Sequence, residues 1–150
     1  MSKGVLPVFE TALQKTHQWL NDVMIRMGWD DQHKAYQVLR AVLHAIRDRL
    51  PAEIAVKFAS QLPMIIRGFY YEGWKPSQTP IKVTTLNDFL ALVSMHISSP
   101  QFTNNRELEA VTKVVFAVLN DYLSHGEMEN IKKAFPEHLS SLWPAEPAYR

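Results

Sequence analysis

The chain has 150 residues, of which 47% are hydrophobic and 21% charged, and it contains no cysteine. This composition predicts one globular domain, residues 1–150, and excludes disulfides, thiol catalysis and cysteine-bound metal. The formal net charge of +1 supplies no strong field, so nucleic acid is not an expected partner. No apolar run is long enough to span a membrane and no secretory signal is recognisable, so we expect a cytoplasmic location.

The first helix is expected over 8–27, because apolar residues recur there at helical spacing. Gly28 is its expected stop. Its inward stripe is predicted to comprise Phe9, Leu13, Leu20, Met24 and Met27. A second helix is expected to reach residue 50, with Asp30 or Asp31 as its N-cap.

A third helix is expected to begin at Pro51, where the missing N–H of proline costs nothing. Pro63 lies inside the apolar stripe of this helix and predicts a kink or a break. A separate short helix then ends near Gly73. The polar, proline-bracketed segment 75–82 is expected to be a connector.

Three more helices are predicted after the connector. Thr85 and Ser124 each have the spacing of an N-terminal capping box and open the fourth and sixth helices. Asn104 or Asn105 can cap the fifth helix, and residues 98–100 are expected to close the fourth. The tail, 144–150, has little to pack against.

The two halves of the chain resemble each other at an offset of 73 positions without a gap. Identical pairs include Val38 with Val111, Leu50 with Leu123, and Pro63 with Pro136. We therefore predict an all-α fold in which two tandem three-helix units, 8–74 and 83–143, arise by internal duplication and pack into one helical bundle.

Polar and aromatic residues are concentrated in the first unit. Tyr36, Arg40, His44 and Arg47 fall on one face of the second helix, and a second group lies at the end of the short helix. The candidate ligand- or partner-binding residues are Arg40, His44, Arg47, Arg67, Tyr70, Tyr71, Glu72 and Trp74. Arg40, Arg47 and Arg67 would grip an anion if the two helices meet.

A structural interpretation of the same residues stays open. The arginines would then pair with Asp48, Glu53 and Glu72, the tyrosines would pack at a helix junction, and His44 would be a satisfied core histidine. No catalytic residues are predicted, because no nucleophile or orienting carboxylate accompanies His44 on its helix face. The scattered histidines and the few glycines predict no metal site and no cofactor.

Three segments carry a resemblance to a known bacterial family: 28–36, 39–50 and 61–74. The chain resembles the domain-of-unknown-function family numbered 2267 from Phe9 to Pro144, most strongly in the first half. The resemblance implies an all-helical, duplicated bacterial domain. It implies no catalytic residues, because the family has no established activity.

Two functions compete at this point. The favoured hypothesis is a non-enzymatic protein-interaction module, with a protein partner or self-association, because helices run throughout and large aromatic residues lie between Phe69 and Trp74. The alternative is a protein or enzyme that binds a small anion in the first unit, at Arg40, His44, Arg47 and Arg67. Nucleic-acid binding is a weaker third possibility.

Overall fold

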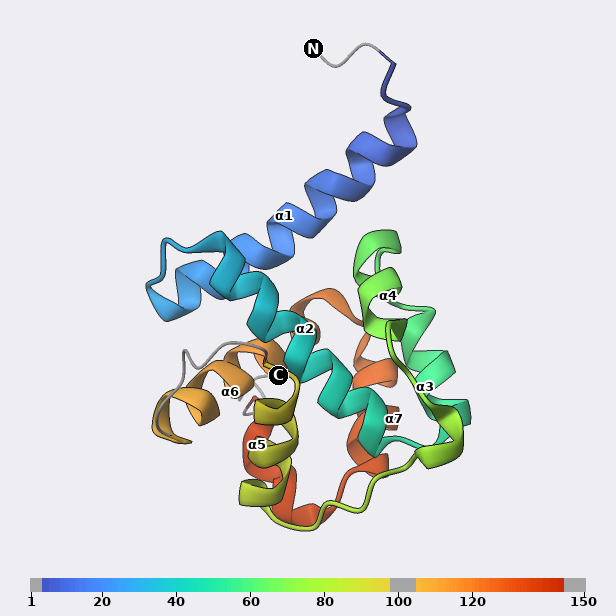
Figure 1. Cartoon of the computed structure of the whole chain (residues 1–150), viewed down its shortest axis with the longest axis vertical. Coiled ribbons are helices and arrows are strands. Elements are labelled where there is room, and N and C mark those ends of the chain that lie inside the picture. Colours follow the sequence, from blue (N-terminus) through green and yellow to red (C-terminus); the bar gives the residue numbers. More distant parts are fainter. Residues whose placement is uncertain (1–3, 98–104, 145–150) are drawn as a thin grey trace, which may run out of the picture.

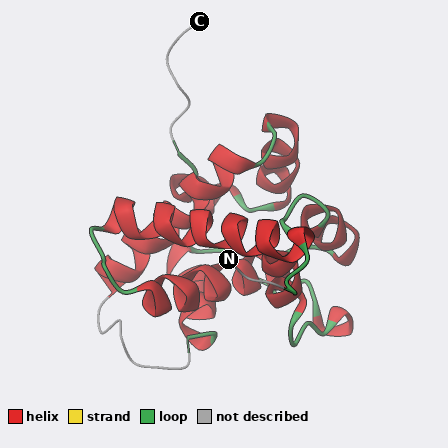
Figure 2. Ribbon diagram, turned by 90° about the horizontal axis from the view of Figure 1, so that it is seen from above, coloured by secondary structure: helices red, strands yellow, loops and turns green. Residues whose placement is uncertain are grey.

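The computed structural model describes residues 4–97 and 105–144. These residues form α-helices and two short 3-10 helices and include no strand, which confirms the predicted all-α class (Figures 1 and 2). The elements are α1 (Pro7–Met27), α2 (Gln32–Arg49), α3 (Ala52–Ala59), α4 (Met64–Tyr71), η1 (Pro76–Gln78), α5 (Leu86–Met95), α6 (Asn105–Tyr122), α7 (His125–Ala134) and η2 (Glu137–Leu142). The expected end of the fourth helix at 98–100, the cap at Asn104 and the tail beyond Pro144 lie outside the described residues.

Local sequence signals set most helix ends. Asp31 accepts a hydrogen bond from the Lys34 N–H at the start of α2, while Thr85 and Ser124 cap α5 and α7 in the same way. Gly28 ends α1 in the left-handed region, at φ 71°, which glycine adopts without steric cost. Each of these predicted caps and stops is confirmed, because each depends only on neighbours in the sequence.

Pro63 separates α3 from α4, as its lack of an N–H predicts. The second half repeats this organisation, since Pro136 precedes η2. The starts of α3 and α4 are the starts of α7 and η2 shifted by 73 residues: 52 and 125, 64 and 137. This agreement favours duplication, although a common origin of the halves stays a prediction.

Helix α2 runs through the middle of the molecule (Figure 1). α1, α4, α5 and α6 all pack against it, and each residue from Ala41 to Asp48 is buried. A helix that is covered on all sides normally carries apolar residues throughout. Three of these eight buried residues are instead His44, Arg47 and Asp48.

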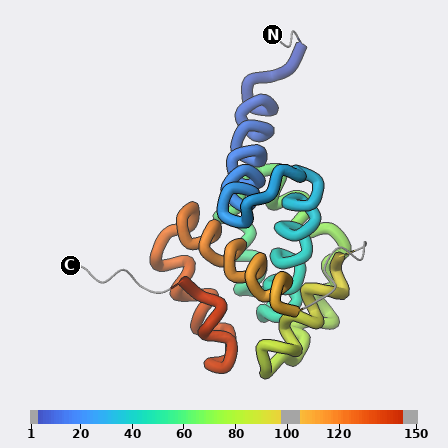
Figure 3. Tube along the Cα trace, turned by 90° about the vertical axis from the view of Figure 1, so that its left-hand side faces the viewer, coloured from blue at the N-terminus to red at the C-terminus, as the bar shows by residue number. Residues whose placement is uncertain are grey.

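The predicted stripe of α1 is wrong in its first half. Phe9 and Leu13 are about half exposed, and the residues that α1 buries are Ala12, Thr16, Trp19, Leu20 and Val23. The N-terminal end of α1 rises above the rest of the chain (Figure 3). Where α4 packs against the first half of α1, it covers Ala12 and leaves Phe9 and Leu13 about half exposed. Among the described residues, no helix is long and apolar enough to span a lipid bilayer.

Candidate functional site

Arg47 links the central helix to the end of α4. Its Nε donates to Asp48 Oδ1 at 2.9 Å, and its Nη1 donates to the backbone oxygens of Tyr70 at 2.9 Å and Glu72 at 2.8 Å. The last carbonyls of a helix have no partner within the helix, so this buried guanidinium satisfies them. Arg47 thereby fixes where α4 ends and where Glu72 stands.

Asp48 joins Arg47 to a histidine from the other half of the chain. His96, the C-cap residue of α5, donates from Nε2 to Asp48 Oδ2 at 2.9 Å. Burial by itself would raise the pKa of the Asp48 carboxyl, but the hydrogen bonds from His96 and Arg47 outweigh it and lower this pKa. The carboxylate therefore stays charged and holds the side chains of Arg47 and His96 in place.

His44 lies beside this network as a neutral imidazole. Its Nε2 donates to the Phe69 carbonyl at 2.6 Å, and its ring meets the ring of His96 edge-on with centroids 5.1 Å apart. Burial lowers the pKa of His44 to about 4, against the hydrogen bond to Phe69, and the charges of Arg47 and Arg40 lower it further. Protonation of His44 at neutral pH is therefore disfavoured.

A polar pocket of about 430 Å³ opens above these groups, between α2, α5 and the end of α4. We call it the α2–α4–α5 pocket. It is lined by His33, Tyr36, Gln37, Arg40, Glu72 and His96. The Arg40 Nε lies 3.6 Å from the Glu72 Oε1, beyond the range of a good hydrogen bond, and Glu72 is largely exposed. The Tyr36 ring is held by an edge contact with Phe69, with centroids 5.3 Å apart.

The structure divides the eight residues predicted from sequence. Arg40 and Glu72 line the α2–α4–α5 pocket, while His44 and Arg47 lie in the buried network described above. Arg67 is elsewhere: it lines a different hollow, against the first half of α1, and donates to the carbonyls of Ala59 and Leu62. The prediction that Arg40, Arg47 and Arg67 bind one anion together is therefore wrong. Arg47 and Arg67 donate to backbone carbonyls instead, and only Arg40 lines the pocket.

The three predicted aromatic residues form a packed row. Tyr70 is fully buried, its hydroxyl donates to the Ala55 carbonyl at 2.8 Å, and burial raises its pKa. Tyr71 contacts both the Tyr70 ring and the Trp74 ring, with centroids 5.3 and 5.5 Å apart. Tyr71 and Trp74 are half-buried, so the aromatic surface predicted from sequence is reduced but not eliminated.

His33 and His96 were not singled out by sequence, although both line the pocket. His33 lies one residue after the start of α2 and so within reach of the face that carries Arg40. No signal in the sequence could have found His96, because only the packing of α5 on α2 brings it to Asp48. Within 4–97 and 105–144, no three His, Cys, Asp or Glu side chains are placed to hold a metal ion.

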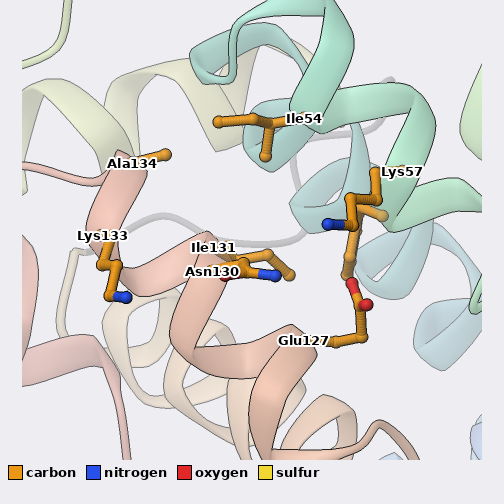
Figure 4. Close-up of a pocket in the computed structure, with 8 residues that line it drawn as sticks. Ile54, Lys57, Glu127, Asn130, Ile131, Lys133 and Ala134 are labelled. Carbon is orange, nitrogen blue, oxygen red and sulfur yellow. The ribbon is translucent and has the colours of Figure 1, made fainter.

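A second hollow, of about 330 Å³, lies between α3 and α7 and is mainly apolar. Figure 4 shows Ile54 of α3 on one side and Ile131 and Ala134 of α7 on the other. Lys57 and Lys133 stand at its two edges. Its polar groups, on Lys57, Glu127, Asn130 and Lys133, surround a mainly apolar lining. The lining of the α2–α4–α5 pocket is polar or aromatic throughout, so this pocket is the better candidate site for a specific polar ligand.

These features define an all-helical domain that is built around a buried polar network and carries a polar pocket over it. Residues 16–142 match the family model described as "Uncharacterized conserved protein (DUF2267)". The chain belongs to that family, as its sequence resemblance implied. The match includes every residue of the pocket and leaves out the first turns of α1. A comparison with curated proteins finds no match.

Proposed function

We propose that this domain binds a small organic anion in the α2–α4–α5 pocket and does so without catalysis. The observation that supports this most is the position of Arg40. Its guanidinium lines the pocket and is held there by a long, exposed ion pair with Glu72, which contributes at most about 1 kcal/mol. A ligand carboxylate can replace Glu72 and pair with the guanidinium fork through two hydrogen bonds.

The rest of the pocket suits the same ligand. Its volume of about 430 Å³ falls in the range of small-molecule sites. His96 is oriented by Asp48, and Tyr36 offers an aromatic face beside Arg40. The six lining residues include no serine, cysteine or threonine, so acyl transfer through a hydroxyl or thiol of these residues is not proposed.

The buried network of Arg47, Asp48 and His96 also supports this proposal, because its contribution to stability does not explain why it is there. A buried ion pair is often no more stabilising than apolar residues of the same size. Arg47 and Asp48 are nevertheless buried in the middle of the fold, where they set the positions of Glu72 and of the His96 ring. A role in shaping the pocket accounts for polar groups at a place where stability alone favours an apolar core.

The proposal can be tested by titrating the ¹⁵N-labelled protein with sodium benzoate and with citrate at constant ionic strength. We expect saturable shifts of the backbone amide signals of His33, Tyr36 and His96. Arg40→Gln should weaken binding at least tenfold. The matched control is Arg26→Gln, which removes an exposed arginine paired with Asp121 on another part of the surface and should leave binding unchanged. Equal responses of Arg40→Gln and the wild type would refute the proposal.

Protein interaction is a second candidate function, as the sequence favoured. It is supported by the apolar residues that α1 exposes on its first turns, among them Leu6, Phe9 and Leu13. This surface lies outside the residues that match the family model. The two functions therefore involve separate parts of the chain and can be tested independently.

A further inference from the structure

One apolar seam follows α1 along its whole length. Its residues are spaced alternately by three and four positions, which is the heptad spacing of helices that pair along a seam. The seam comprises Leu6, Phe9, Leu13, Thr16, Leu20, Val23 and Met27. The sequence of α1 is thus typical of a helix that is covered by a partner from one end to the other.

The domain covers only the second part of this seam. Thr16, Leu20 and Val23 are buried against the bundle, whereas Leu6, Phe9 and Leu13 are 55%, 52% and 50% exposed. The N-terminal end of α1 projects beyond the rest of the bundle in two perpendicular views (Figures 1 and 3), and α4 flanks its Val8 side across a hollow. Ala12, one turn before Thr16, is still buried, because α4 packs against the first half of α1. Leu6, Phe9 and Leu13 lie beside this covered side and are the seam positions that the bundle leaves open.

We propose that a second copy of this chain supplies that cover, and that the two α1 helices pair antiparallel through Leu6, Phe9 and Leu13. This inference rests on the second of the proposed functions and names its partner. The α1 helix of a second copy exposes the same three seam residues. In a dimer with one twofold axis, each copy covers the exposed seam of the other. Near that axis Phe9 meets Phe9 of the partner subunit, and Leu6 of each copy lies beside Leu13 of the other.

The bundle itself determines the orientation. From Thr16 onward, the side of α1 that carries the seam is occupied by the chain's own helices. A parallel partner would run into this bundle. An antiparallel partner places the second bundle at the opposite end of the helix pair.

The exposed apolar area agrees with a dimer. The three seam residues, each about half exposed, together leave open on the order of 300 Å² of mainly apolar surface, the size of an apolar patch that marks an interaction site. A standard interface buries about 800 Å² per partner, of which roughly 60% is apolar, so these residues supply more than half of the apolar part of one such interface.

Sedimentation velocity between 5 and 200 µM tests the pairing. We expect the wild type to form a dimer and Leu13→Lys to weaken dimerisation at least tenfold. The control Ile25→Lys also places a lysine on α1, but at a position that is 76% exposed and off the seam, and it should dimerise like the wild type. Because both positions are exposed, circular dichroism should show the same helix content in both variants. A monomeric wild type at 200 µM would overturn the proposal.

Charge exchange tests the orientation. In the antiparallel pair, Leu6→Glu combined with Leu13→Lys places opposite charges next to each other. We therefore expect the double variant to dimerise at least tenfold more tightly than Leu13→Lys alone. A parallel pair would place like charges together, so a double variant no tighter than the single one would overturn the antiparallel arrangement.

A photo-crosslinker distinguishes failure of self-pairing from failure of the interaction function. Phe9 is replaced by p-benzoylphenylalanine, and the full-length protein is irradiated in lysate of the expressing cells. A crosslinked homodimer is the expected product. Adducts with other proteins alone would overturn self-pairing and leave the interaction function standing, whereas no adduct at all would overturn both.

Discussion

Arg47 is the residue on which most of the buried network depends. It neutralises Asp48 and satisfies the carbonyls of Tyr70 and Glu72 at the end of α4. Removing one partner of a buried pair leaves the other uncompensated, so Arg47→Met should lower the free energy of unfolding by about 3–5 kcal/mol. Urea denaturation measures this loss. Arg26→Met, which removes an exposed arginine, should cost less than about 1 kcal/mol.

His44 gives the stability of the fold a defined pH dependence. Its pKa is about 4 in the folded chain and about 6.5 when unfolded, so between these values only the unfolded chain takes up the proton. Stability therefore falls as the pH drops from 6.5 to 4, by about 1.4 kcal/mol for each pH unit. Above pH 6.5 the group is neutral in both states and contributes no pH dependence.

The variant His44→Gln tests this assignment, because a glutamine amide can still donate to the Phe69 carbonyl but does not titrate. Urea midpoints measured from pH 7 to pH 4 should fall less steeply in the variant than in the wild type. Asp48 acts in a separate range, since its lowered pKa affects stability only below about pH 3.8. Parallel curves for the two proteins between pH 6.5 and 4 would show that His44 is not the titrating group.

At the residue scale, sequence identified the helix face but not its surroundings. Helical spacing placed Arg40, His44 and Arg47 together, which the structure confirms. Spacing could not show that other helices cover α2 on every side. Because of this packing, Arg40 reaches a pocket while Arg47 donates to backbone carbonyls. His96 escaped prediction because its partner, Asp48, lies 48 positions away in the chain.

At the scale of the element, capping predictions succeeded because a cap is a local interaction. Ser124 Oγ accepts a hydrogen bond from the Glu127 N–H at 3.2 Å and so begins α7. Ser124→Ala should cost about 1 kcal/mol of unfolding free energy, and Ser124→Asn should restore most of it, since asparagine also accepts at this position. Thermal unfolding of the three proteins measures the difference. Equal losses for alanine and asparagine would argue against a capping role.

The predicted apolar stripe of α1 was wrong in its first half because burial depends on distant parts of the chain and not on local interactions. Helical periodicity predicts which residues share a face, but not how far a neighbouring bundle extends along that face. Phe9 and Leu13 belong to the same seam as Leu20, yet they stay about half exposed while Ala12, between them in the chain, is buried, so here the bundle covers a neighbouring side of the helix. The mismatch between pattern and burial is itself informative, because it marks the part of α1 that a partner can cover.

At the scale of the whole molecule, the two halves share one core. α2 packs against α5 and α6, α1 against α6, and α3 against α7. The connector is also attached to the centre, since the Ile81 N–H donates to the Asp48 carbonyl at 2.7 Å. Each half thus covers apolar surface that the other would expose to water, so neither half has a complete core of its own.

This arrangement predicts how separated halves behave. Fragments 1–74 and 75–150 should each lack a dispersed NMR spectrum, because α2 loses the helices that bury it and α6 loses α1 and α2. Mixing the two fragments should restore the dispersed spectrum, since the lost contacts are noncovalent and the cut falls in the connector. If fragment 1–74 instead folded alone, the two halves would be independent domains. The hydrogen bond between Asp48 and His96 would then connect two domains that are each already folded.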